Sequence, residues 1–157
     1  SIEQAKLESW SASNDTGVKY FSGSATYRTS INVPNDWLNS DAKLLLDLGT
    51  VDDLAEVLIN GSSLGILWKP PYQIDVTGAL KPGENELQIK VTNEWTNRIA
   101  GDRVATPETR AFPAPPTVAR PGGAGGGGGG GGGGFGAPPA PPPVSGLLGP
   151  VTIQSVK

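Results

Sequence analysis

Ser24-Ala25-Thr26-Tyr27-Arg28-Thr29-Ser30-Ile31-Asn32-Val33 is the stretch of this 157-residue sequence that decides the fold. Its odd-numbered side chains, from Ala25 to Val33, alternate with small polar and charged ones. A period of two gives a β-strand one buried face and one hydrated face. Pro34, Asn35 and Asp36 end the pattern, because this cluster is typical of a turn. We therefore expect a long strand over residues 24–33.

Similar short apolar runs follow along the chain, with turn residues between them. They predict strands over residues 43–49, 55–60, 63–67, 73–76, 86–92 and 151–156. Asn60-Gly61 predicts a tight hairpin, since both residues tolerate a positive φ. Pro82-Gly83 predicts a turn, because Pro presets φ and Gly relieves strain. Only single helical turns are expected, near residues 36–38 and 51–54. The pattern indicates an all-β sandwich or barrel.

The composition excludes several classes of chemistry. The chain has no Cys, no His and no Met, so disulfide scaffolds, zinc fingers and Ser-His-Asp triads are excluded. The net charge is −3 and the basic residues are scattered, which argues against a nucleic-acid partner. No apolar run approaches the roughly 20 residues of a membrane span, so no membrane partner is expected. We expect a monomer.

Gly and Pro are concentrated near the C-terminal end. Residues 122–136 hold 13 of the 23 Gly, and residues 107–143 hold 10 of the 15 Pro. The tail that follows is too short to form a domain, so its strand is expected to return to the same sheet. We predict a single domain over residues 1–157, with a Gly/Pro-rich insertion at about 111–144 before the closing strand 151–156. Loop-closure cost grows only logarithmically with length, which makes such an insertion tolerable.

Several short motifs occur in a recognisable order. They are Tyr20-Phe21-Ser22-Gly23-Ser24-Ala25-Thr26-Tyr27, Ala55-Glu56-Val57-Leu58-Ile59-Asn60-Gly61, Trp68-Lys69-Pro70-Pro71-Tyr72, Leu80-Lys81-Pro82-Gly83-Glu84-Asn85, Trp95-Thr96-Asn97-Arg98-Ile99-Ala100-Gly101-Asp102 and Ser145-Gly146-Leu147-Leu148-Gly149-Pro150-Val151. This order resembles the sugar-binding, galactose-binding-like jelly roll of glycoside hydrolase family 2. It is more similar still to the C-terminal β-sandwich of family 106 α-L-rhamnosidases.

The resemblance implies a jelly-roll β-sandwich of the galactose-binding-domain type. It also implies a module of a larger, secreted or periplasmic bacterial enzyme that degrades polysaccharide. In family 2 enzymes the catalytic acid and nucleophile lie on a separate barrel domain, and this chain is too short to contain one. We therefore expect no catalytic residue here, and a catalytic domain of the same polypeptide as a partner. Fold alone does not establish function, so sugar binding must be argued from a site.

Aromatic and polar side chains outside the predicted strands are the candidates for that site. Sugars are recognised by aromatic faces and by planar polar groups that bond to hydroxyls. The predicted ligand-binding residues are Trp68, Tyr72, Trp95, Asn97, Arg98 and Asp102. The competing interpretation is structural: loop Trp residues often plug the ends of a sandwich, and Arg98 and Asp102, at i and i+4, are spaced for an ion pair. For Trp95, Arg98 and Asp102 we favour the structural interpretation. For Trp68 and Tyr72 the structural and the ligand-binding interpretations are evenly balanced.

The remaining aromatic residues are assigned to the core. Trp10 and Trp37 are expected to plug the core or its edge. Tyr20, Phe21 and Tyr27 are expected in the core, because they lie on or near strands.

Two further features are weighed and set aside. Asp52, Asp53 and Glu56, with Asp47 nearby, are favoured as a solvated acidic turn, with a structural Ca²⁺ as the alternative and no other cofactor expected. The Gly run is no phosphate loop, because no Lys, Ser or Thr follows it.

Two functional hypotheses follow from these observations. The first is a non-catalytic carbohydrate-binding module that holds plant or algal polysaccharide through its loop aromatics. The alternative is a structural accessory domain that packs on a catalytic domain without binding sugar by itself.

Overall fold

Antiparallel strands make up most of the chain. The structure is a computed structural model and describes residues 2–3, 5–38, 42–112 and 141–156. In chain order its elements are η1 (Trp10–Ala12), α1 (Thr16–Lys19), β1 (Ser24–Val33), α2 (Asn35–Leu38), β2 (Lys43–Asp47), β3 (Thr50–Asp52), β4 (Leu54–Ile59), β5 (Ser62–Leu67), β6 (Gln73–Asp75), β7 (Gly83–Thr92), α3 (Thr96–Val104), β8 (Gly146–Gly149) and β9 (Thr152–Val156). Each strand predicted from the sequence is present.

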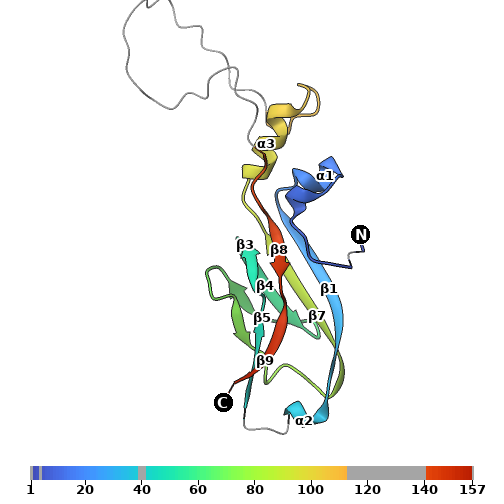
Figure 1. Cartoon of the computed structure of the whole chain (residues 1–157), viewed down its shortest axis with the longest axis vertical. Coiled ribbons are helices and arrows are strands. Elements are labelled where there is room, and N and C mark those ends of the chain that lie inside the picture. Colours follow the sequence, from blue (N-terminus) through green and yellow to red (C-terminus); the bar gives the residue numbers. More distant parts are fainter. Residues whose placement is uncertain (1, 4, 39–41, 113–140, 157) are drawn as a thin grey trace, which may run out of the picture.

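The strands form two layers (Figure 1). One layer is a four-stranded sheet in the order β1-β7-β4-β5. The other consists of the three-stranded sheet β6-β2-β9 and the two-stranded sheet β3-β8. Because β2 leads directly into β3 and β8 into β9, the β3-β8 pair continues the β2-β9 ladder past Gly49 and Gly149. The predicted all-β sandwich is confirmed.

The core lies between these layers and is built from alternate side chains of the facing strands. Leu44, Leu46 and Leu48 are buried, as their period of two predicts. The facing rows come from β4 (Ala55, Val57 and Ile59) and from β7 (Leu87, Ile89 and Val91). The register pairs Ala55 with Val91 and Val57 with Ile89, so these two rows form one apolar surface.

The two predicted turns lead into strands of the four-stranded sheet: one joins β4 to β5, and the other precedes β7 on the way from β6 of the facing sheet. Asn60 has a φ of 51° and Gly61 a φ of 81°, so the β4–β5 connection is the expected hairpin. Gly83 has a φ of 82° where the Pro82-Gly83 turn enters β7. Both turns therefore depend on residues that tolerate the left-handed region.

Three features differ from the sequence predictions or lie beyond them. The single turn predicted at 36–38 is confirmed as α2. Residues 51–54 instead contain the end of β3, a bend at Asp53 and the start of β4, so the helical turn predicted there was wrong. Helix α3 follows β7 where no helix was expected. Most of the predicted insertion, residues 113–140, lies outside the described residues.

The aromatic residues assigned to the core lie there to different degrees. Trp10 is buried, and Phe21 and Tyr27 are half-buried against the core. Tyr20 is half-buried against the Cα of Gly101 in α3, where an added Cβ would come within 2.7 Å of the Tyr20 Cβ. Trp37 is partly exposed at the edge of the sandwich, beside a groove described below.

Candidate functional site

Asn97 lies on the buried side of α3 and holds the C-terminal end of the Gly/Pro-rich region. Its side chain is 2% exposed. The Nδ2 atom donates to the Pro143 carbonyl at 3.1 Å and to the Ser145 hydroxyl at 3.0 Å. Both hydrogens of this amide are therefore occupied by protein groups. Asn97, predicted as a ligand-binding residue, holds the chain entering β8 against α3.

Asp102 has a similar structural role one turn further along α3. Its two carboxylate oxygens accept hydrogen bonds from the backbone N–H groups of Ala111 and Phe112, both at 2.9 Å. The bond from Ala111 is the main reason that the pKa of Asp102 is lowered. The carboxylate therefore folds the segment after α3 back onto the helix, as a charge that accepts backbone hydrogen bonds does well.

Arg98 forms the ion pair that its spacing from Asp102 allows. The Arg98 Nε atom lies 3.3 Å from Asp102 Oδ1, although this contact lacks hydrogen-bond geometry. The Arg98 Nη2 atom donates to the Thr109 carbonyl at 3.2 Å. The backbone N–H of Arg98 donates to the Ser22 hydroxyl at 2.9 Å, which ties α3 to the start of β1. The side chain and the backbone of Arg98, a predicted ligand-binding residue, thus both contact other groups of the protein.

Trp95 precedes α3 and is 65% exposed. Its ring lies against Phe112, with ring centroids 5.1 Å apart and planes inclined by 35°. Because Asp102 holds the backbone of Phe112, the same turn that occupies the carboxylate also brings an aromatic partner to Trp95.

Trp68 and Tyr72 lie at the two ends of the loop between β5 and β6, in different environments. Trp68 is 66% exposed, and the Lys69 ammonium lies 4.9 Å from the centroid of its ring, which is cation–π distance. Tyr72 packs against the core and its hydroxyl donates to the Asp53 carbonyl at 3.1 Å. Burial and then the charges of Asp53 and Asp52 raise the pKa of the Tyr72 hydroxyl.

The β3–β4 turn connects this loop to the start of α3. Asp53 Oδ2 accepts the backbone N–H of Glu94 at 2.8 Å, next to the bond from Tyr72. Burial raises the pKa of Asp52, and the nearby charges of Asp53 and Glu94 add to that effect. Three segments therefore meet at an acidic turn whose charges repel one another.

Carboxylates in the described ranges do not gather into a metal site, since no group of three or more His, Cys, Asp or Glu side chains there is arranged to hold an ion. Glu56 instead accepts a hydrogen bond from Ser63 and lies 3.9 Å from the Lys90 ammonium. Asp47 accepts hydrogen bonds from Gln73 and Gly49, in that order the main reasons why its pKa is lowered.

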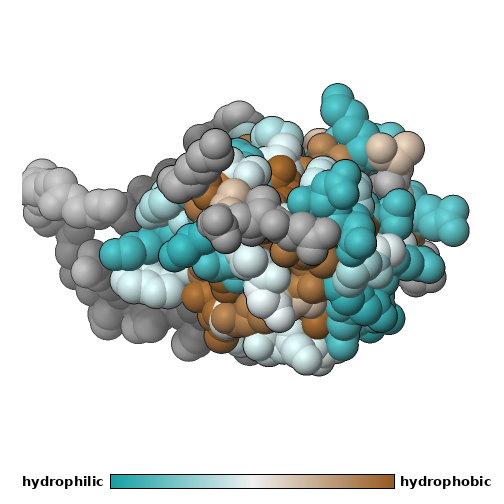
Figure 2. Space-filling view, turned by 90° about the horizontal axis from the view of Figure 1, so that it is seen from below, coloured by the Kyte–Doolittle hydropathy of each residue, from teal (hydrophilic) through white to brown (hydrophobic). Residues whose placement is uncertain are grey.

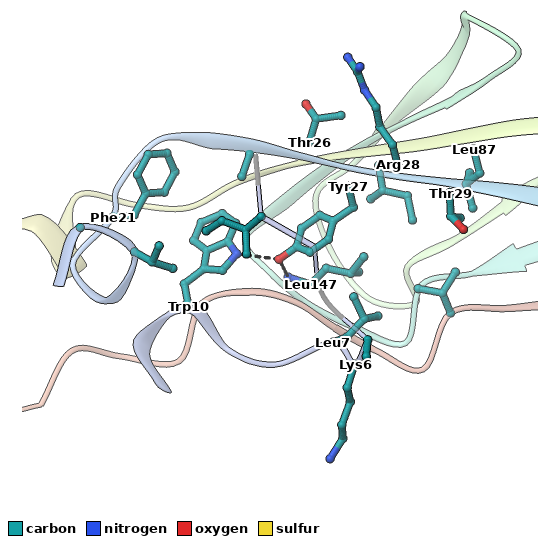
Figure 3. Close-up of a pocket in the computed structure, with 17 residues that line it drawn as sticks. Lys6, Leu7, Trp10, Phe21, Thr26, Tyr27, Arg28, Thr29, Leu87 and Leu147 are labelled. Carbon is teal, nitrogen blue, oxygen red and sulfur yellow. Dashed lines mark hydrogen bonds between the residues drawn. The ribbon is translucent and has the colours of Figure 1, made fainter. Parts of the chain in front are cut away.

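The described part of the chain also contains two apolar grooves, and none of the six predicted binding residues lines either. The first, of about 640 Å³, lies between the N-terminal segment, β1 and β8 (Figure 3). Inside it the Trp10 Nε1 donates to the Tyr27 hydroxyl at 2.6 Å, and that hydroxyl accepts the backbone N–H of Leu147 at 3.2 Å. The Trp10 indole N–H, the Tyr27 hydroxyl and the Leu147 amide are therefore paired with one another.

The second groove, of about 370 Å³, continues the first along the open side of the sandwich. Both are lined by Thr29, Leu87 and Val151. Sequence reasoning assigned the inner face of β1 to the core. It missed the grooves, because alternation identifies a strand face but does not reveal whether another element covers it.

The fold and its motifs place the chain in a family. Residues 5–118 match the model of the glycosyl hydrolase 2 galactose-binding domain-like family, and the chain belongs to that family. The predicted resemblance to the family 2 sugar-binding domain is confirmed. No helix in the described ranges is long and apolar enough to cross a membrane.

Similar proteins are larger than this chain. The "Putative beta-glucuronidase" of Formosa agariphila is 52% identical over 97 residues, which are 62% of this chain and 8% of that protein. A solved rhamnosidase from Novosphingobium sp. PP1Y is 39% identical, with a TM-score of 0.73 over 97% of this chain and 13% of its own. A beta-glucuronidase from an uncultured Clostridium sp. is 29% identical, with a TM-score of 0.50 over 57% of this chain and 16% of its own. The chain thus spans less than a sixth of these relatives.

Proposed function

We propose that this chain is a non-catalytic accessory module of a larger glycosidase, and that it packs on the remainder of that polypeptide. The observation that carries the proposal is the share of each protein that aligns. Nearly the whole chain, 97%, aligns with only 13% of a rhamnosidase. The simplest interpretation is that the chain is one of several modules of the polypeptide, and that another module cleaves the glycosidic bond.

The carboxylates of the chain support a non-catalytic role. Glycoside hydrolysis uses a pair of carboxyl groups, roughly 5–10 Å apart, that flank a cleft. Neither of the two grooves is lined by an Asp or a Glu. The carboxylates with the best-defined surroundings, Asp102 and Asp47, accept backbone and amide hydrogen bonds and serve the fold.

An exposed apolar patch on the outer face of the four-stranded sheet is suited to packing. Glu56 pairs with Ile66 and Ala55 with Leu67, so the register continued by one residue places Trp68 opposite Leu54. Leu54, Ile66 and Trp68 are all exposed, Ile66 at 61%. We name these three residues the outer patch. Contiguous exposed apolar side chains of this kind mark interaction surfaces.

A matched pair of variants in the larger glycosidase tests this role. Ile66→Lys places a charge in the outer patch, whereas Ser30→Lys places the same charge on the same sheet, opposite Glu86. We expect Ile66→Lys to lower the melting temperature of the intact enzyme and Ser30→Lys to leave it unchanged, as followed by differential scanning calorimetry. Equal melting temperatures for both variants and the parent would exclude packing through the outer patch.

Direct sugar contact by Trp68 is the second candidate, because Trp68 is 66% exposed, whereas the similarly exposed Trp95 packs against Phe112. Stacking of a pyranose on an indole face needs such exposure. Against it stands the scarcity of free polar partners: Asn97, Arg98, Asp102 and the Tyr72 hydroxyl all bond within the chain.

Calorimetric titration with a panel of monosaccharides and polysaccharides, L-rhamnose included, separates the two candidates. Binding that Trp68→Ala abolishes, in a variant that remains folded, would establish sugar contact. Absence of binding across the panel would leave the accessory role alone.

A further inference from the structure

The two apolar grooves form one continuous channel along the open side of the sandwich. Buried core side chains reach it, since Leu87 and Ile89 line the first groove and Leu46 and Leu87 the second. Seen from the α2 end, hydrophobic surface lies between more hydrophilic flanks (Figure 2). We name this feature the open channel. These core side chains are themselves buried, but Tyr27 and Ile31, which also line the channel, are only half-buried, and exposed apolar surface of this kind marks an interaction site.

Two sheet edges border the open channel. Among the described residues, β1 pairs only with β7 and β9 pairs only with β2. Thr29 and Ile31 of β1 lie on one side of the channel, and Thr152 and Ile153 of β9 lie on the other. Each edge leaves alternate backbone N–H and C=O groups without a strand partner, which makes it a template for a further strand.

The open channel leaves a side chain on the inner face of β1 uncovered. Thr29 pairs with buried Leu87, so it faces inward, yet Thr29 is exposed. Its neighbour Ser30 pairs with Glu86 on the outer face and is also exposed. An inward-facing residue in the middle of a ten-residue strand is normally covered by the opposite sheet.

The strand count shows which edge is incomplete. One layer has four strands, whereas the other has three strand positions: β6, then β2 with β3, then β9 with β8. Jelly rolls of this architecture have eight strands in two sheets. A strand added to β9 gives four facing four and crosses the channel, whereas a strand added to β1 gives five facing three.

We propose that the open channel receives one further β-strand, which would fill the eighth strand position of the sandwich. Another part of the same larger polypeptide supplies this strand, and it pairs with the free edge of β9. Its chemistry follows from the channel: an extended segment whose alternate side chains are apolar and point between β9 and β1. This is β-strand addition, in which main-chain hydrogen bonds bind and alternate side chains fill pockets. Residues 113–140 do not fit, because Gly, Pro and Ala dominate their sequence. The inference rests on the part of the proposed function that places the chain in a larger polypeptide.

Hydrogen exchange of the larger polypeptide, followed by mass spectrometry, tests the pairing. With an eighth strand, the amides of Thr152–Val156 exchange as slowly as those of β2, which has strands on both sides. Without it, the amides of β9 that face away from β2 exchange rapidly. Rapid exchange overturns the proposal, as does slow exchange that is lost on dilution, since the occupant would then be a second copy.

A pair of Lys variants in the same polypeptide tests the burial. Thr29→Lys points into the open channel and Ser30→Lys points away from it, although both residues are exposed in this chain. If a strand covers the channel, Thr29→Lys lowers the melting temperature of the module by at least about 5 °C and Ser30→Lys does not. Equal melting temperatures overturn the proposal. Neither readout depends on the outer patch or on sugar, so the two proposals fail separately.

Discussion

At the scale of the residue, Asn85 shows how one side chain can fix two turns. It is 1% exposed. Its Nδ2 atom donates to the carbonyls of Lys81 and Gly83 at 2.7 and 3.0 Å. Its Oδ1 atom accepts from the Lys81 N–H and from Asn60 Nδ2, both at 2.9 Å. The amide thereby reaches its full complement of four hydrogen bonds and connects the β4–β5 hairpin to the turn before β7.

Asn85→Ala should therefore be costly. It removes a fully buried amide and leaves the backbone groups of Lys81 and Gly83 without their partner, and we expect the free energy of unfolding to fall by about 2–4 kcal/mol. Asn32→Ala, at an exposed position on the outer face of β1, should change it by no more than about 0.5 kcal/mol. Urea unfolding of both variants measures the difference. Similar midpoints for the two would show that the turns form without the amide.

Asp52 gives a prediction that depends on pH. Its folded-state pKa is raised above 3.8, first by burial and then by the charges of Asp53 and Glu94. Ionisation of Asp52 therefore opposes folding. This opposition is absent below the ordinary pKa, develops as pH rises towards the folded pKa, and is complete above it. Asp52→Asn should raise the melting temperature by a few degrees at pH 7 and should have no such effect at pH 3. A stabilisation that is equal at both pH values would contradict the electrostatic cause.

At the scale of the element, local pattern predicted the strands but not all of the helices. Strand faces such as Leu44, Leu46 and Leu48 show the period of two directly. Helix α3 buries Asn97, Ala100, Gly101 and Asp102, a face of small and polar residues that no search for apolar periodicity detects. Val51 was misassigned to a helical turn because its strand partner is Leu147, which local pattern cannot reveal.

The candidate site was predictable only in part for the same reason. Residue type identified the aromatic and polar candidates near α3, and the i, i+4 spacing suggested the ion pair of Arg98 with Asp102. Whether Asn97 is free depends on partners 46 and 48 residues away, at Pro143 and Ser145. Such distant pairing is determined by the fold, so it could not be read from the neighbouring sequence.

The β2–β3 and β8–β9 connections cross at Gly49 and Gly149 with no room for a side chain on Gly49. A Cβ on Gly49 would clash with the Gly149 carbonyl, and the φ of Gly49 is +64°. Gly61 has a φ of +81° but open space around it, and the surroundings of Gly78 are also open. Gly61 therefore shows the effect of a positive φ alone, Gly49 combines a positive φ with close approach of another backbone segment, and Gly78 has neither.

Alanine substitutions at these glycines should form a graded series. We expect Gly78→Ala to change the free energy of unfolding by no more than about 0.5 kcal/mol. Gly61→Ala should cost about 1–2 kcal/mol through its positive φ. Gly49→Ala should cost at least about 4 kcal/mol, because two backbone segments must also separate. Chemical denaturation measures the series, and a Gly49 variant as stable as the Gly61 variant would mean that the crossing can relax.

At the scale of the whole molecule, the anchors around the Gly/Pro-rich region determine how it can be changed. Asp102 holds residues 111 and 112 on one side, and Asn97 holds Pro143 and Ser145 on the other. Both anchors belong to α3. The two flanks are therefore fixed to one helix by contacts that do not involve the ten consecutive Gly at positions 125–134.

Deletion of those ten Gly should leave the fold intact. Shortening a closed loop lowers its entropic cost as the logarithm of its length, so the deletion should stabilise the chain by less than about 0.5 kcal/mol. Thermal unfolding of the deletion variant and of the parent measures this effect. The control is Asn97→Ala with the loop at full length, which removes one anchor and should lower the melting temperature clearly, because the Pro143 and Ser145 groups lose a buried partner. A large destabilisation by the deletion would instead show that the Gly run makes contacts on which the sandwich depends.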